Sequence, residues 1–201
     1  MREKFATNGT AFILRYYNYE GKGLDKIKYG LLTFYSFFTK TITVFVIALL
    51  LGTFWEMLVF KTFYMITRCF SYGAHATKNI YCWIITLSIY TFVPILISLV
   101  TINDITKFWI VIIALISFVL YAPSDTHKRP LINKKKRHFS KMMSLIILIF
   151  FEIIILFTNN KLFINCAALA LIIQCICLYP LTYRIFKMPY NNYMTYKRGL
   201  N

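Results

Sequence analysis

Residues 81–122, YCWIITLSIYTFVPILISLVTINDITKFWIVIIALISFVLYA, decide the fold, because two long apolar runs meet at one short polar turn. The runs are Tyr81–Ile102 and Ile105–Ala122, and only Asn103 and Asp104 separate them. A bilayer core about 30 Å thick requires roughly 20 helical residues, because backbone amides in lipid must be hydrogen-bonded within the segment. The stretch therefore predicts two antiparallel membrane-spanning helices.

The rest of the chain continues this pattern. Two further apolar runs, Met142–Phe157 and Leu162–Pro180, form a second tight pair. The 38 residues from Gly30 to Thr67 are interrupted by charged residues and by Gly52, so they predict two short tilted helices turning near Gly52, or a re-entrant hairpin. We therefore predict an all-α polytopic membrane protein with about six membrane-embedded helices.

The composition supports a membrane protein. Hydrophobic residues make up 59% of the 201-residue chain and its mean hydropathy is +0.61, more apolar surface than one small soluble core hides. The net charge of +16 comes from basic residues beside apolar runs, so we expect no nucleic-acid partner. The cysteines have no zinc-ligand spacing and there is no Walker-type loop, so we expect no metal or cofactor.

Basic residues predict the orientation in the membrane. Residues 123–141 carry seven Lys or Arg, whereas the turns at 103–104 and 158–161 together carry one Lys. The positive-inside rule therefore places 123–141 in the cytoplasm, and counting crossings places both termini there too. We expect one domain of three parts: a cytoplasmic N-terminal segment (1–29), a helical membrane region (30–180) and a cytoplasmic tail (181–201).

The N-terminal segment favours two alternatives equally. Aromatic and basic residues between 12 and 28 are typical of an amphipathic helix on the inner leaflet, or of an unstructured basic tail. It contains no compact apolar region followed by a small-residue cleavage site, so we expect no removable signal peptide.

Residues 68–82, RCFSYGAHATKNIYC, combine a histidine and a cysteine at the predicted inner face. With Asn79 as N-cap, Cys82 falls in the first turn of a helix, where free N–H groups favour a thiolate. His75 lies about 10 Å away along an unbroken helix, so a working pair requires the chain to fold back near Gly73. The alternative is that Cys82 is a small apolar filler and His75 a hydrogen-bonded boundary residue.

Two separated blocks resemble the AgrB family, the accessory gene regulator B proteins of Gram-positive bacteria. The first is Arg68, then Gly73-Ala74-His75-Ala76, then Cys82. The second is YAPSDTHKRPL, residues 121–131, in which His127, Lys128 and Arg129 stand where some relatives carry three lysines. The first 28 residues and the tail after Pro180 give no firm match.

The resemblance implies a membrane-embedded cysteine endopeptidase of the bacterial cell membrane. Such an enzyme removes the C-terminal part of an AgrD-like propeptide and helps to close the remainder into a thiolactone autoinducing peptide used in quorum sensing. His75 and Cys82 match the catalytic pair, while Arg68 and Gly73 match supporting positions. The resemblance also makes a homodimer the expected assembly.

Charge indicates how such a substrate is held. The basic stretch from Lys128 to Lys141, beginning with Lys128 and Arg129, faces the side needed to attract an acidic propeptide tail. Asp125 is chemically able to orient the imidazole of His75, but nothing in the sequence places it near His75. Glu56 and Glu152 lie in apolar runs and receive no role.

A small transporter and a non-catalytic scaffold share the same span count and charge pattern. A transporter is expected to contain paired halves with helices broken by Gly or Pro near mid-membrane, and here Pro94 is the one mid-span proline. A scaffold predicts that Cys82 tolerates replacement by Ser or Ala.

The predicted orientation is testable by labelling. In Arg137→Cys, a membrane-impermeant thiol reagent should label the new cysteine in inverted vesicles but not in intact cells, because residues 123–141 face the cytoplasm. The unsubstituted chain is the control, because its own five cysteines can also react with the reagent. Labelling of position 137 in intact cells would overturn the orientation.

Overall fold

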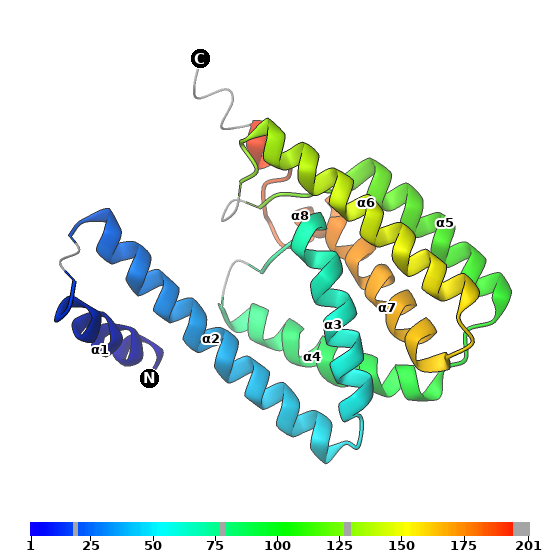
Figure 1. The fold of residues 1–201 in the computed structure, drawn as a ribbon, viewed down its shortest axis with the longest axis horizontal. Helices are drawn as coiled ribbons and strands as arrows, with labels where there is room; N and C mark the ends of the chain where they lie inside the picture. Colours follow the sequence, from blue (N-terminus) through cyan, green and yellow to red (C-terminus); the bar gives the residue numbers. More distant parts are fainter. Residues whose placement is uncertain (18–19, 77–78, 127–129, 195–201) are drawn as a thin grey trace. The chain divides into compact units, whose positions relative to one another are not determined.

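The computed structural model describes residues 1–17, 20–76, 79–126 and 130–194. Within these ranges the chain is helical and contains no strand, which confirms the all-α prediction (Figure 1). The helices are α1 (Arg2–Leu14), α2 (Lys22–Leu50), α3 (Phe54–Ser71), α4 (Asn79–Leu99), α5 (Asp104–Tyr121), α6 (Lys134–Phe157), α7 (Lys161–Leu178) and α8 (Pro180–Ile185). Contacts divide them into two compact units, Met1–Leu51 and Gly52–Asn201.

The first unit is a pair of packed helices, α1 and α2. The Phe5 and Tyr35 rings stack obliquely with centroids 5.2 Å apart. A Cβ at Gly9 would lie 3.0 Å from Leu31 Cδ1, so the absence of a side chain there allows the two helices to approach closely. Ala6 is fully buried in the same contact region.

Two predictions for this unit were wrong. The first membrane helix is not short, because α2 has 29 residues and begins at Lys22, inside the segment expected to precede the membrane region. Neither alternative for the N-terminal segment matches its described residues: instead of an amphipathic helix over 12–28 or an unstructured tail, the segment contains α1 (Arg2–Leu14) and the start of α2. Charged residues end an apolar pattern, but lysine is a good helix former and does not end a backbone helix. The predicted turn near Gly52 is confirmed, with φ +68° between α2 and α3.

Helix α7 is the centre of the second unit. It packs against α3, α4, α5, α6 and α8, and lies among them in Figure 1. Its buried face carries the small residues Ala167, Ala168 and Ala170, which allow neighbouring backbones to approach closely. Aromatic contacts extend this core, for example Phe63 on α3 against Phe151 on α6, with ring centroids 4.7 Å apart.

Three asparagines cap the N-termini of α5, α6 and α7. Asn103 Oδ1 accepts a hydrogen bond from Thr106 N before α5, and Asn133 and Asn160 do the same for the first N–H groups of α6 and α7. These groups have no partner within their own helix, so the caps fix where each helix starts.

Four predicted spans correspond to α4, α5, α6 and α7. The main difference is α6, which begins at Lys134 instead of Met142, because the Asn133 cap starts the helix eight residues before its apolar part. Five helices are long and apolar enough to cross a membrane: α2, α4, α5, α6 and α7. Helix α3 carries Glu56, Lys61 and Arg68 within 18 residues, so its crossing stays a prediction.

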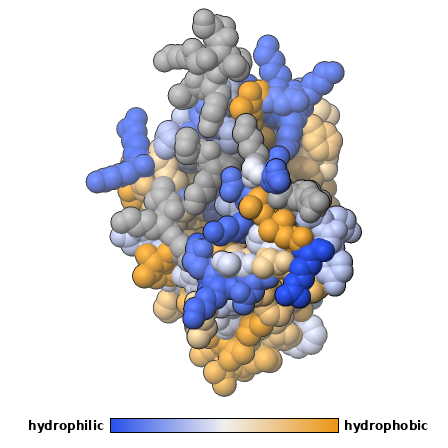
Figure 2. Space-filling view, turned by 90° about the vertical axis from the view of Figure 1, so that its left-hand side faces the viewer, coloured by the Kyte–Doolittle hydropathy of each residue, from blue (hydrophilic) through white to orange (hydrophobic). Residues whose placement is uncertain are grey.

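The exposed surface agrees with a membrane environment. Large apolar side chains such as Trp109, Ile113 and Ile153 are exposed instead of buried. In Figure 2 hydrophobic residues predominate in the lower part of the face shown. Such extensive exposure of apolar groups is unfavourable in water and is expected for a surface that contacts lipid.

Asn165 provides a test of how the core is held. Its buried Nδ2 donates to the carbonyl oxygens of Ile97 (3.0 Å) and Val100 (2.7 Å), where α4 ends. Asn165→Leu should cost about 1–3 kcal/mol, because it leaves these carbonyls without a donor. Thermal unfolding in detergent measures the loss. Asn159→Leu alters an exposed asparagine two residues before α7 and should have little effect, and equal losses in both variants would contradict the role of Asn165.

Candidate active site

The structure places the predicted His and Cys on different elements. Helix α3 ends at Ser71, His75 lies exposed in the connection that follows, and Cys82 lies half-buried in the first turn of α4. Asn79 is the first residue of α4 instead of the residue before it, a shift of one position. The chain therefore leaves helical geometry between the two residues, as predicted, while direct contact between imidazole and sulfur stays a prediction.

The connection turns sharply at Tyr72 and Gly73, whose φ angles are +60° and +110°. A Cβ at Gly73 would lie 3.1 Å from both Cβ and the carbonyl oxygen of Cys177 on α7. Glycine is therefore needed for two reasons: a backbone conformation that other residues rarely adopt, and close approach to α7.

Hydrogen bonds attach this connection to two distant parts of the chain. Gly73 N donates to Ser124 O (2.9 Å), and Ser124 N donates to Ser71 O (3.1 Å). Ala74 N donates to Cys177 O (2.8 Å). We call residues 71–74, Ser124 and Cys177 the junction. It fixes the backbone immediately before His75.

Arg68 reinforces the junction from α3. Its guanidinium donates to the carbonyl oxygen of Ala74 and, at 2.6 Å, to the Tyr64 hydroxyl. Through these two contacts Arg68 holds the connection that follows α3. The carbonyl oxygen of Ala74 is thus held by Arg68, and its N–H group is held by Cys177 of α7.

Gln174 is a buried polar residue on α7 that joins the same region. Its Nε2 donates to Ser71 Oγ (2.6 Å) and to Tyr72 O (2.8 Å). The Tyr64 hydroxyl lies 3.7 Å from Cys177 Sγ, within the range of a weak hydrogen bond. The Gln174 amide nitrogen is thus hydrogen-bonded although the residue is buried, and it ties α7 to the end of α3.

The second sequence block packs onto the first through Ser124. Its Oγ donates to the carbonyl oxygens of Tyr121 (2.7 Å) and Leu178 (3.2 Å), and its carbonyl accepts from the Tyr183 hydroxyl (3.1 Å). Burial raises the pKa of Tyr183, which keeps the phenol protonated as a donor. The two blocks, about 50 residues apart in sequence, therefore meet at the ends of α3, α5 and α7.

Comparison with known proteins identifies the family. The family model described as Accessory gene regulator B matches residues 6–178. The chain belongs to the AgrB family. The match includes both blocks and the whole junction, so the resemblance of residues 68–82 and 121–131 is confirmed at the level of the family.

Individual relatives give the same result. A putative AgrB-like protein of Listeria innocua is 32% identical over 183 residues, which cover 88% of this chain and 86% of that protein. Accessory gene regulator protein B of Staphylococcus aureus is 33% identical over 123 residues, 60% of this chain and 66% of the relative. A putative AgrB-like protein of Clostridium acetobutylicum is 24% identical over 98% of this chain and 95% of the relative. No solved structure shows a significant match.

Some functional candidates lie elsewhere or are not described. Lys128 and Arg129, expected to bind substrate, lie outside the described residues. Asp125 is buried and accepts backbone N–H groups from Leu131, Asn192 and Tyr193 at 3.0–3.2 Å. In this AgrB-family chain Asp125 therefore anchors the C-terminal segment, which explains its burial without a catalytic role.

Sequence reasoning missed Tyr64, Ser124 and Gln174. Gln174 left a signal, a polar amide inside the apolar run 162–180, since a buried amide in a membrane helix requires partners. Tyr64 lies one helical turn before Arg68, a spacing that brings their side chains together. Ser124 left no local signal, because its partners in α3, the connection, α7 and α8 are more than 50 residues away in the sequence.

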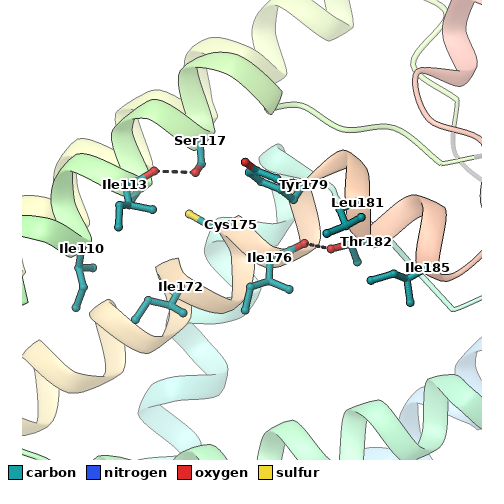
Figure 3. Close-up of a pocket in the computed structure, with 11 residues that line it drawn as sticks. Ile110, Ile113, Ser117, Ile172, Cys175, Ile176, Tyr179, Leu181, Thr182 and Ile185 are labelled. Atoms are coloured by element: carbon teal, nitrogen blue, oxygen red, sulfur yellow. Dashed lines mark hydrogen bonds between the residues drawn. The ribbon is translucent and has the colours of Figure 1, made fainter.

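An apolar pocket of about 510 Å³ opens between α5, α7 and α8 (Figure 3). Ser117 and Cys175 are among its few polar or sulfur-containing side chains, and Ser117 Oγ donates to Ile113 O (2.7 Å). None of the predicted site residues that the structure describes lines this pocket. It is therefore separate from the candidate active site.

Gly73 provides a test of the junction. Gly73→Ala should destabilise the fold by about 1–3 kcal/mol, because the positive φ is strained for alanine and the new Cβ contacts Cys177. Thermal unfolding in detergent measures the change. Gly30→Ala is the matched control, since Gly30 lies within α2 with open space around its Cβ position. That variant should be unchanged or more stable by about 0.5–1 kcal/mol, and a neutral Gly73→Ala would contradict the strain argument.

Proposed function

We propose that this chain is a membrane-embedded cysteine endopeptidase that cleaves the C-terminal part of a quorum-sensing propeptide and promotes cyclisation of the remainder. The observation that carries the proposal is the junction, which holds both backbone polar groups of Ala74 directly before His75. Cys82 follows in the first turn of α4. Membership of the AgrB family supports the same assignment.

The anchored connection suits a base that must act repeatedly in one place. The backbone of Tyr72, Gly73 and Ala74 is held by α3, α7 and Ser124, so the position from which His75 extends is restricted. Restricting a catalytic group before the reaction lowers the entropy cost of reaching the reactive geometry. Arg68, Gly73 and Gln174 then act as positioning residues, not as groups that contact substrate.

In the proposed first step the Cys82 thiolate attacks a propeptide carbonyl carbon. His75 accepts the thiol proton and returns it to the leaving amine, so that the C–N bond breaks and a thioester to Cys82 forms. The C-terminal fragment departs with a new amino terminus. The N–H groups in the first turn of α4 provide a positive environment for the sulfur anion.

In the second step a cysteine thiol within the bound propeptide attacks the Cys82 thioester. The new thioester closes a thiolactone ring, and Cys82 leaves as a thiolate that is protonated for the next cycle. One thioester replaces another, so the exchange is close to neutral in energy and requires no ATP. A tethered thiol also has a high effective concentration, which favours ring closure over hydrolysis at a site with limited water.

The partners follow from charge and location. The acidic tail of an AgrD-like propeptide would be attracted by the basic stretch from Lys128 to Lys141, whose described part lies at the start of α6. The positive-inside rule assigns this end, and hence the active site, to the cytoplasmic face of the cell membrane. A homodimer is the proposed assembly.

Mass measurement of the products tests the chemistry. When the chain is coexpressed with its propeptide, Cys82→Ala and His75→Ala should each abolish the cleaved fragment and the cyclic product, because the nucleophile or its base is missing. Cys69→Ala is the matched control: it removes an exposed thiol from α3 and should leave both products unchanged.

Trapping the intermediate identifies the nucleophile. The wild-type chain should carry a hydroxylamine-sensitive propeptide adduct that is present in Cys69→Ala and absent in Cys82→Ala. Normal cleavage by Cys82→Ala would exclude the peptidase mechanism and leave the transporter or scaffold alternatives. An adduct that persists in Cys82→Ala would assign the nucleophile to another cysteine.

A further inference from the structure

A second, polar pocket lies where α5 ends and α6 begins. Its volume is about 490 Å³, and the C-terminal segment around Tyr193 forms one wall. The lining residues are Leu120, Tyr121, Ala122, Pro123, Lys134, Arg137, His138, Lys141, Tyr190, Asn191 and Tyr193. The pocket contains neither His75 nor Cys82, so the proposed catalytic steps do not account for it.

The basic residues of the pocket share one face of α6. Lys134, Arg137, His138 and Lys141 are spaced by three, four and seven residues from the first, which aligns them along the helix. No acidic residue is among the lining side chains that the structure describes. Positive charges at these spacings repel one another, and a bound anion would reduce this repulsion.

Two of these side chains have contacts that shape the pocket. Lys141 Nζ donates to the carbonyl oxygens of Phe118, Val119 and Ala122, where α5 ends. The Arg137 guanidinium carbon lies 3.7 Å from the centroid of the Tyr193 ring. Stacking uses the face of the guanidinium, and its N–H groups lie in the plane, so they stay available to an anion.

Asp125 keeps the aromatic wall in place, and it is not itself one of the lining residues. Its carboxylate accepts the backbone N–H groups of Asn192 and Tyr193, and it accepts that of Leu131 as well. These bonds fix the C-terminal segment, so that Tyr193 lies under Arg137. The pocket is therefore a built site, with a fixed wall opposite a row of basic side chains.

The surroundings of the pocket favour an amphiphilic ligand. The pocket lies at the ends of two helices that are long and apolar enough to cross a membrane. Leu120 lines the pocket and is 64% exposed, and Ile116 on α5 and Ile146 on α6 are exposed farther along the same helices. A polar pocket that continues into apolar surface matches a charged headgroup joined to acyl chains better than a wholly polar peptide.

We propose that this pocket binds the phosphate headgroup of an anionic membrane lipid, with Lys134 and Arg137 as the principal contacts. Basic pockets between membrane helices near the cytoplasmic face are suited to such headgroups. The inference goes beyond the proposed function, because it requires no peptidase chemistry. Its test is made without propeptide, so its failure would leave the peptidase proposal standing.

Native mass spectrometry of the purified full-length chain tests the proposal. The protein is incubated with an equal mixture of phosphatidylglycerol and phosphatidylcholine of identical acyl chains. Wild type should retain phosphatidylglycerol preferentially. The double variant Lys134→Gln with Arg137→Gln should lose about tenfold of that preference, since each substitution removes a charge-assisted hydrogen bond.

Lys135→Gln with Lys136→Gln is the matched control. It removes the same charge from the same helical turn, but these two exposed residues do not line the pocket. This variant should keep the wild-type preference. Equal loss of preference in both double variants would show that net charge alone attracts the lipid. That result would overturn the assignment of this pocket as the lipid-binding site.

Two competition experiments distinguish the source of the anion. Inorganic phosphate should displace phosphatidylglycerol only weakly, because it lacks the acyl chains that contact the apolar surface. Displacement at equal concentrations by phosphate, or by a short glutamate-rich peptide, would overturn the lipid assignment in favour of a free anion or an acidic peptide. Both double variants should elute like wild type in size-exclusion chromatography, which confirms that any loss of binding occurs in folded protein.

Discussion

The need to satisfy buried polar groups at the ends of helices governs the second unit. At the end of α3 the backbone leaves helical geometry through two residues with positive φ, and its N–H and C=O groups lose helical partners. In a low-dielectric setting each unpaired group is costly, so the chain supplies partners from α7, from Ser124 and from Arg68. The connection before α4 is therefore held by contacts from outside itself.

Lys141 and Asn165 follow the same rule at other helix ends. Lys141 donates to three carbonyl oxygens at the end of α5, where a positive charge also complements the helix dipole. Asn165 donates to two carbonyl oxygens at the end of α4. Each donor comes from another helix, so satisfying the helix ends also fixes how neighbouring helices pack.

The sequence predicted the helices that are defined by apolar residues better than those that begin with charged residues. Apolar runs and the polar turns between them predicted α4, α5 and α7 to within three residues, because helix length in a membrane is set by bilayer thickness. The start of α6 was predicted eight residues too late, because a basic helical turn has no apolar signal. For α2 the same cause made the predicted helix too short.

The candidate site was predictable only in part. The positions of His75 in a connection and Cys82 in a first helical turn followed from Gly73 and local capping residues. The contacts that hold them did not follow, because Ser124, Gln174 and Cys177 are about 50 to 105 residues away in the sequence. Asp125 illustrates the limit: its carboxylate is occupied by the C-terminal segment, which no local pattern indicates.

Residues 124 and 125 connect the two proposed sites. The carbonyl of Ser124 accepts the N–H of Gly73, two residues before His75. The next residue, Asp125, holds the segment whose Tyr193 stacks under Arg137 in the basic pocket. One short stretch of backbone is thus attached to the connection that carries His75 on one side and to the wall of the proposed lipid pocket on the other.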